Sequence, residues 1–214
     1  MASTRFQCIM DAMIEPRSPR YRHIFLDAEG TLYVPKQGRS RWEFWADPSP
    51  EAAVDFFELD DGVVTALELL RKNADSICIV SRNTAPILNA LLEKFGILHY
   101  FDEVILSTNK GKSIERYLSD RGLNPEEALM VGDMPTLDLY PVRAVGVDAI
   151  LVDRQYNRVA RVERIRGVKD LPAWLKAVEI ADRMEKGRVR MSTLDDFFAP
   201  LRTATKSLIG VSGV

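Results

Sequence analysis

The sequence predicts an α/β protein in which helices cover both faces of a parallel sheet. Short apolar runs alternate with segments whose apolar residues recur at helical spacing, which is typical of parallel strands joined by crossover helices. Polar side chains follow several of these runs, as they do where parallel strands end at a ligand site. The 214 residues suffice for one compact domain with additional terminal segments.

Five apolar runs are the candidate strands, and a turn or a polar residue follows each of them. The runs are short and apolar throughout, as expected for strands that are buried on both faces. The expected strands are residues 23–26, 77–80, 104–106, 128–131 and 149–152.

Four further segments carry an apolar stripe at helical spacing. Asp60 or Asp61 is expected to cap the first of them, and Thr84 to open the second, which Gly96 ends. The polar and aromatic stretch before the first helix is expected to form a flap and a loop. The expected helices cover residues 63–70, 84–95, 110–121 and 171–184.

This alternation defines the predicted domain, residues 21–185. Residues 1–20 are predicted to be an N-terminal arm and residues 186–214 a C-terminal tail. We expect no separate cap domain, because only 49 residues separate the threonine at position 31 from the serine at position 81, and only 28 separate that serine from the lysine at position 110.

Composition excludes several classes of protein. The net charge of −2 disfavours a globally basic nucleic-acid binder. Cys8 and Cys78 cannot form a disulfide framework, and with only His23 and His99 beside them a zinc site has few ligands. The sequence shows neither an apolar run that could cross a bilayer nor the core of a signal peptide. We therefore expect a cytoplasmic protein with no membrane association.

Four polar side chains stand at or just after predicted strand ends or at the start of a predicted helix. Asp27 and Ser81 directly follow apolar runs, Asp133 follows another after one glycine, and Lys110 starts a helix. In a parallel sheet these positions meet at one edge. Carboxylates suit a hard cation such as Mg²⁺, while a hydroxyl and an ammonium suit phosphoryl oxygens. The alternative is that each is a turn or cap residue.

The same residues carry a family resemblance. Residues 25–32 resemble the first motif of the haloacid dehalogenase superfamily, an aspartate followed by x-D-G-T-L. Residues 79–81 are similar to the second motif, and Lys110 resembles the lysine of the third. Residues 129–133, with Asp138 five positions on, match the acidic fourth motif. The resemblance implies a three-layer, Rossmann-like domain.

The resemblance also implies a mechanism, the Mg²⁺-dependent hydrolysis of phosphomonoesters. Asp27 would attack phosphorus and become an aspartyl phosphate. The carboxylates of Asp27 and Asp133 and the backbone carbonyl of Glu29 would bind Mg²⁺, and Asp138 would complete or support that shell. The resemblance therefore leads us to expect a phosphatase.

The resemblance further implies which residues bind the phosphoryl group. Lys110 would offset the charge of the nucleophile and the phosphate, with Lys112 as the alternative. The turn after the second strand and the aromatic insertion resemble the small capless magnesium-dependent phosphatases, whose open site admits bulky substrates, including phosphoproteins and nucleic-acid ends. We expect the substrate to be a phosphorylated small molecule, a phosphoprotein or a DNA end. The residues expected to position or bind substrate are Thr31, Ser81, Arg82 and Asn83.

Glu29 departs from the family pattern, which places a second aspartate there as general acid and base. The extra methylene moves the carboxyl group by roughly 1.5 Å. A misplacement of about 1 Å can lower a rate on the order of a hundredfold. Slow turnover, an adjusted loop and lost catalysis are the three alternatives.

Three aromatic residues of the predicted flap have two interpretations. Trp42, Phe44 and Trp45 either wall the substrate site or pack on the sheet as a lid. The basic stretch 154–169 likewise either contacts nucleic-acid phosphates or is a solvated face.

The tail resembles the box through which replication and repair proteins bind a sliding clamp. Leu194, Phe197 and Phe198 match its aliphatic and aromatic positions, but Met191 stands where the box has glutamine. The alternative is that the aromatic pair packs on its own domain or on a second copy, as in a homodimer. The competing functions are therefore a phosphatase, a clamp-associated DNA-end phosphatase, and a non-catalytic partner protein that recognises phosphate.

Overall fold

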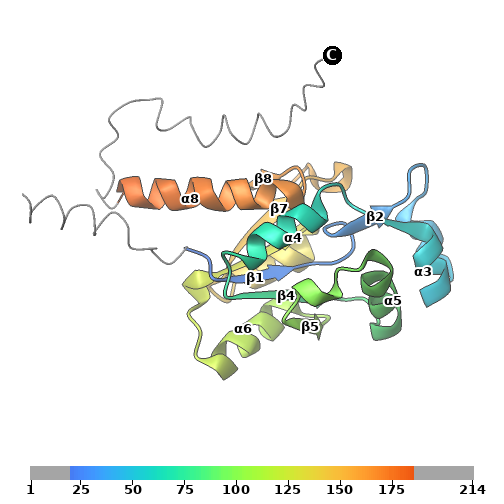
Figure 1. Cartoon of the computed structure of the whole chain (residues 1–214), viewed down its shortest axis with the longest axis horizontal. Helices are drawn as coiled ribbons and strands as arrows, with labels where there is room; N and C mark the ends of the chain where they lie inside the picture. The colour runs from blue at the N-terminus through green and yellow to red at the C-terminus, as the bar shows by residue number, and fades with distance from the viewer. Residues whose placement is uncertain (1–19, 186–214) are drawn as a thin grey trace, which may run out of the picture.

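The computed structural model describes residues 20–185. A six-stranded parallel sheet in the order β5-β4-β1-β6-β7-β8 forms the middle layer (Figure 1). This confirms the predicted α/β fold with a parallel sheet. The predicted tail, and the arm up to residue 19, lie outside the described residues. The strands are β1 (His23–Leu26), β4 (Ser76–Ser81), β5 (Glu103–Leu106), β6 (Ala128–Gly132), β7 (Asp148–Val152) and β8 (Arg164–Ile165).

Two apolar clusters hold helices on opposite faces of this sheet, because alternate strand residues point to opposite sides. Ile24 and Leu26 of β1 join the cluster of α4 (Val63–Arg71), α5 (Ala85–Phe95) and α8 (Leu171–Glu185). Phe25 joins the cluster of α6 (Lys110–Arg121) and α7 (Tyr140–Arg143). Figure 1 shows α4 and α8 on one side of the sheet and α6 on the other. The expected three layers are confirmed.

All five predicted strands and all four predicted helices are present. Thr84 and Gly96 flank α5 as expected, and Gly96 has a φ of 64°, the left-handed conformation that ends many helices. The predicted aspartate cap of α4 is wrong, since Gly62 is its N-cap. Asp60 instead pairs with Arg154, and Asp61 pairs with a lysine more than 100 residues away in the sequence.

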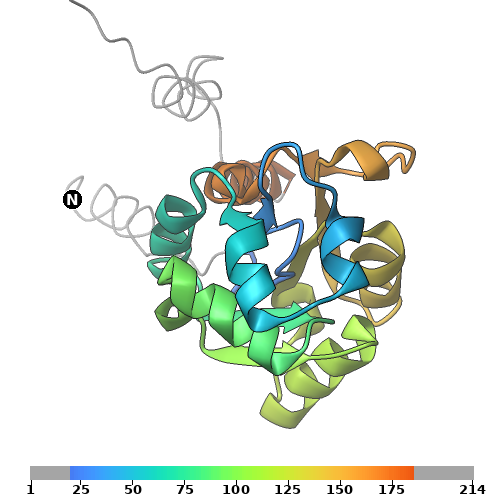
Figure 2. The ribbon, with the colours of Figure 1, turned by 90° about the vertical axis from the view of Figure 1, so that its right-hand side faces the viewer.

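The segment between β1 and α4 is an insertion, for which the sequence predicted only a flap and a loop. β2 (Tyr33–Pro35) and β3 (Phe57–Leu59) pair antiparallel. Between them lie α2 (Arg41–Ala46) and α3 (Pro50–Phe56), on the side of the molecule that faces the viewer in Figure 2. Among the described residues this two-helix insertion is the only addition between β1 and α4.

Both helices of the insertion begin at capping residues. Ser40 and Glu43 form a capping box at the start of α2, in which the glutamate accepts the backbone N–H of Ser40. Ser49 accepts the backbone N–H of Ala52 at 3.1 Å and caps α3. Phe44, Phe56 and Phe57 are buried in the core cluster that also contains Ile24 and Leu26 of β1, so the insertion is anchored on the domain.

Candidate active site

The sheet order brings the sequence-predicted polar residues together. β1 lies between β4 and β6, so Asp27 stands between Ser81 at the end of β4 and Asp133 beyond the end of β6. Lys110 is the first residue of α6, the helix that follows β5, and its side chain contacts Asp27 at the same edge of the sheet. All four side chains are buried, although each is polar or charged. Such a cluster needs mutual pairing or a ligand to be stable.

Three carboxylates form an acidic cluster at this edge. Asp27, Asp133 and Asp138 each offer an oxygen within 4.8 Å of the others. Burial is the largest cause that raises the pKa of Asp27 and of Asp138 to about 6, against the lowering effect of Lys110. Burial, and then the charge of Asp138, also raise the pKa of Asp133. Burial and the nearby negative charges disfavour the ionised form of these carboxylates, so a bound cation would stabilise that form.

The cluster fits a hard divalent cation. Asp133 Oδ1 is buried and has no hydrogen-bond partner among the described residues. A buried carboxylate oxygen left in this way is strongly unfavourable unless a ligand meets it. Oxygen-only donors are what Mg²⁺ prefers. Asp27 and Asp133 are therefore the side chains that would hold the ion, and the family resemblance adds the backbone carbonyl of Glu29 to them.

Asp138 is already engaged by protein donors. Its Oδ1 lies 2.5 Å from Lys110 Nζ, and its Oδ2 accepts the backbone N–H groups of Asp133 at 2.9 Å and Met134 at 2.8 Å. The geometry therefore favours support of the acidic cluster over direct ligation. Gly132 makes this possible, because a Cβ there would lie 2.4 Å from the Cβ of Asp138.

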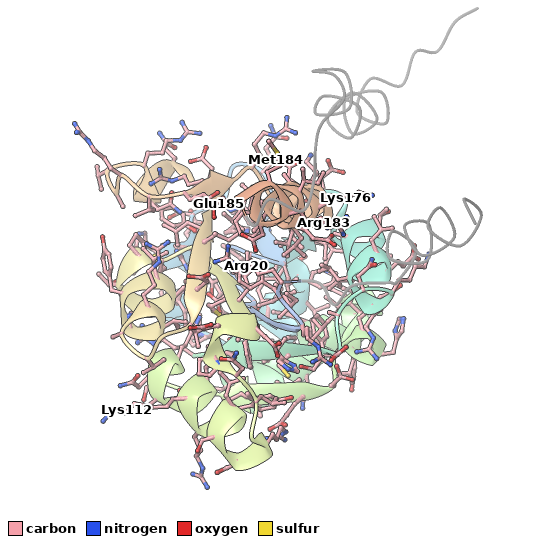
Figure 3. The ribbon with its side chains drawn as sticks, turned by 90° about the vertical axis from the view of Figure 1, so that its left-hand side faces the viewer. Arg20, Lys112, Lys176, Arg183, Met184 and Glu185 are labelled. Carbon is pink, nitrogen blue, oxygen red and sulfur yellow. The ribbon has the colours of Figure 1, made fainter. Side chains whose placement is uncertain are left out.

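Lys110, and not Lys112, is the lysine of the site. Its ammonium lies 2.7 Å from Asp27 Oδ1 and bridges that carboxylate to Asp138. Burial lowers the pKa of Lys110, but the two carboxylates outweigh it and the pKa is raised. Lys112 is exposed and points away from the domain (Figure 3). One fixed positive charge therefore lies beside the candidate nucleophile.

The turn after β1 needs glycine at position 30. Gly30 has a φ of 79°, and a Cβ there would lie 2.3 Å from Asp133 Oδ2. Thr31 is buried, but its hydroxyl has no hydrogen-bond partner among the described residues. The expected part of Thr31 in binding substrate stays a prediction.

The turn after β4 is held by its own side chains. Ser81 Oγ accepts the backbone N–H of Asn83 at 3.1 Å and keeps its own proton free to donate. The Asn83 side chain donates to the Tyr33 hydroxyl at 3.3 Å and accepts the backbone N–H of Thr84 at 2.8 Å. Asn83 therefore shapes the turn, while Arg82 is exposed beside it.

Glu29 is paired with a residue of the insertion that sequence reasoning missed. Its Oε1 lies 3.1 Å from Arg41 Nε and 2.9 Å from Arg41 Nη2. The indole of Trp45 donates to the same oxygen at 3.4 Å. Trp45 thus contacts the site, whereas Phe44 packs in the core and Trp42 is 77% exposed. The capping box at Ser40 was the signal for a helix beginning at Arg41.

A second missed residue, Tyr156, holds Asp133. Its hydroxyl donates to Asp133 Oδ2, and the guanidinium of Arg41 lies 5.1 Å from the centre of its ring. Arg41 Nη1 also lies 3.7 Å from Asp133 Oδ2. Two side chains from distant segments therefore hold one oxygen of Asp133, while Oδ1 has no hydrogen-bond partner among the described residues.

Side chains of the basic stretch 154–169 form hydrogen bonds to backbone groups of the site, and most of the positive charges of the stretch are paired with carboxylates. Arg154 donates to the carbonyl of Gly30 at 2.8 Å and pairs with Asp60, and the Asn157 amide donates to the carbonyl of Asp133 at 2.7 Å. The remaining pairs of this stretch are Arg158 and Arg164 with Asp153, Arg166 with Asp170 and Lys169 with Asp61.

Residues 21–152, more than half of the chain, match the sequence model of the haloacid dehalogenase-like hydrolases. The chain therefore belongs to this family of hydrolases, as its four motifs led us to expect. None of the curated protein sequences matches it.

Solved structures share the fold at low sequence identity. An uncharacterized protein from Listeria monocytogenes serotype 4b is 20% identical, with a TM-score of 0.59 over 74% of this chain and 98% of that one. A HAD phosphatase from Thermococcus onnurineus is 21% identical, with a TM-score of 0.58 over 72% and 97%. The L-2-haloacid dehalogenase from Xanthobacter autotrophicus, with chloropropionic acid covalently bound, is 14% identical, with a TM-score of 0.55 over 73% and 98%.

Within residues 20–185, every helix is too short or too polar to cross a membrane.

Proposed function

We propose that this hydrolase is a Mg²⁺-dependent phosphatase that hydrolyses phosphomonoesters through an aspartyl phosphate on Asp27. The observation that carries the proposal is the orphaned Asp133 Oδ1, buried in an acidic cluster beside Asp27 and Lys110. An oxygen-lined cation position next to a nucleophile and a fixed ammonium suits phosphoryl transfer.

Each residue has a role in this proposal. Bound Mg²⁺ would neutralise charge on the phosphoryl oxygens. Asp27 attacks phosphorus, and Lys110, already paired with it, offsets the charge that gathers there. The Ser81 hydroxyl donates to a phosphoryl oxygen. Glu29 takes a proton from the water that cleaves the aspartyl phosphate.

The test is phosphate release from 4-nitrophenyl phosphate in Mg²⁺ and in EDTA. Wild type should release phosphate only with Mg²⁺, and Asp27→Asn should release none. Asp55→Asn is the matched control, because Asp55 lies on the exposed surface of α3. Turnover that survives Asp27→Asn would overturn the proposal, and so would release of chloride from 2-chloropropionate with no phosphatase activity.

The substrate would be a phosphorylated small molecule, phosphoprotein or DNA end, since the described residues hold no second domain over the site.

A sliding clamp is a further candidate partner, because Leu194, Phe197 and Phe198 of the tail match the pattern of a clamp-binding box. These three residues lie outside the described residues. A peptide of residues 187–207 should bind a clamp, and Phe197→Ala should abolish binding. If deletion of 187–214 dissolves a dimer and leaves hydrolysis intact, the tail serves assembly. Cytoplasmic location stays a prediction.

A further inference from the structure

A turn at the start of the connection between β7 and β8 contacts both loops of the candidate active site. It covers residues 154–157, and its last three residues form a 3₁₀ helix. Arg154 Nε donates to the backbone carbonyl of Gly30 at 2.8 Å. Asn157 Nδ2 donates to the backbone carbonyl of Asp133 at 2.7 Å. One turn therefore holds the loop that follows β1 and the loop that follows β6.

Asn157 lies at the centre of these contacts. Its side chain is buried, and Nδ2 also donates to the carbonyl of Val152, at 2.8 Å, so carbonyl oxygens take both of its N–H groups. Its Oδ1 accepts the backbone N–H of Arg154 at 3.2 Å. A buried amide bonded in this way fixes its neighbours, because moving any of them would leave a buried polar group without a partner.

Arg154 is anchored on the other side of the turn. Its Nη2 lies 2.5 Å from Asp60 Oδ2, in an ion pair whose two side chains are each less than one-fifth exposed. Asp60 in turn donates its backbone N–H to the carbonyl of Leu32 at 2.9 Å. The guanidinium therefore links the turn to the loop after β1 at two points, directly at Gly30 and through Asp60 at Leu32.

Asp133 is held at every polar atom except one. Asp138 accepts its backbone N–H at 2.9 Å, and the Tyr156 hydroxyl donates to its Oδ2. Its carbonyl is bonded to the turn, whereas its buried Oδ1 has no hydrogen-bond partner among the described residues. The contacts that fix the rest of the residue therefore determine where this free oxygen lies.

We propose that the turn 154–157 sets the separation of the two loops and thereby prepares the cation position between Asp27 and Asp133. Arg154 and Asn157 are positioning residues, because each acts through the backbone carbonyl to which it donates. Mg²⁺ demands near-ideal octahedral geometry, so ligands from two loops bind it tightly only when the loops keep their separation. This inference rests on the proposed function and names the element that positions its metal site.

The test is titration calorimetry with MgCl₂ on wild type, on Arg154→Met, on Asn157→Ala and on the double variant. Each single change should raise the Kd for Mg²⁺ by about 10- to 100-fold, as is typical of residues that orient metal ligands. Because cutting either end removes the bridge, the double variant should bind Mg²⁺ at most about threefold more weakly than the weaker single variant.

Two outcomes would overturn the inference and leave the proposed phosphatase standing. The first is a wild-type Kd in either single variant. The second is a double variant whose rise in Kd is the product of the two single rises, since each contact would then act independently of the other. A wild type that does not bind Mg²⁺ would overturn the proposed function together with the inference.

Arg158→Met and Asn124→Ala are the matched controls. Arg158 is an exposed arginine directly after the turn and pairs with Asp153. Asn124 closes another 3₁₀ turn with its side chain, just before β6 and so at the end of that strand opposite to Asp133. Both variants should keep the wild-type Kd. A rise as large as that of the test variants would overturn the inference, because any nearby loss of stability would then weaken binding.

Arg154→Met decides alone if Asn157→Ala does not fold. Its Kd should still rise by at least about tenfold, because the loop after β1 loses its link to the turn. Circular dichroism should show the wild-type helix content. A folded Arg154→Met variant with the wild-type Kd for Mg²⁺ would overturn the inference.

Discussion

Replacing Tyr156 by phenylalanine tests whether the acidic cluster is built to hold a cation. The change removes only the hydroxyl that donates to Asp133 Oδ2. The ring, which lies under the guanidinium of Arg41, is retained. Asp133 then keeps one weaker contact on that oxygen, the Arg41 nitrogen at 3.7 Å, and its carboxylate is held less firmly in the acidic cluster.

The expected loss follows from the bond that is removed. A hydrogen bond to a charged group contributes about 1.5–3 kcal/mol. Half of the Tyr156 side chain is exposed, so we expect water to replace part of the bond and take the lower end of that range. About 1.4 kcal/mol is a tenfold change in a dissociation constant, so the Kd for Mg²⁺ should rise about tenfold, consistent with outer residues of other metal sites.

The assay is titration calorimetry of the purified protein with MgCl₂, which needs no substrate. Tyr140→Phe is the matched control, because Tyr140 is similarly exposed. It should leave the Kd unchanged. A Tyr156→Phe variant with wild-type affinity for Mg²⁺ would refute the reasoning that the Tyr156 bond positions Asp133 as a ligand.

Three further predictions follow from the structure. Gly30→Ala should lower the free energy of unfolding in urea by at least about 2 kcal/mol more than Gly38→Ala, which shares a φ near 80° but has open space around it. Equal losses would show that the close approach to Asp133 Oδ2 is unimportant. Ser49→Ala should lower the same free energy by about 1 kcal/mol, because α3 loses its cap, and no change would contradict the capping role. In EDTA, the raised pKa of Asp27, about 6, means that the folded protein binds more protons than the unfolded chain between about pH 4 and 6. The free energy of unfolding should therefore fall as pH rises through that window, more steeply in wild type than in Asp27→Asn, and Mg²⁺ should recover more of it at pH 7 than at pH 5; parallel curves would contradict this.

The parts of the fold that local sequence determines were predictable. The strands of the sheet are buried on both faces, so they appear as short apolar runs, and β1 and its neighbours begin and end close to their expected residues. The order of motifs along the chain then placed Asp27, Ser81, Lys110 and Asp133 at one edge, because parallel strands end on the same side.

The missed features depend on contacts between distant segments. α2 and α3 are too short to show an apolar period, although their caps at Ser40 and Ser49 were visible in the sequence. β8 has two residues. The Tyr156 hydroxyl meets a carboxylate 23 positions away, which no local pattern reports.

The wrong cap of α4 has the same cause. An aspartate before a helix is a good cap only when nothing else competes for it. Asp60 and Asp61 are taken by Arg154 and Lys169, which lie 94 and 108 positions further along the chain. Gly62 then begins the helix in a left-handed conformation, with a φ of 71°.

The most direct test of the account is to find where the phosphoryl group goes. Wild type mixed with acetyl phosphate and Mg²⁺ should be quenched in acid within one turnover, digested and analysed by mass spectrometry. The account predicts one phosphoryl group on the peptide that contains Asp27, absent in EDTA. Rapid turnover with that peptide unmodified, or with the group on another residue, would contradict it.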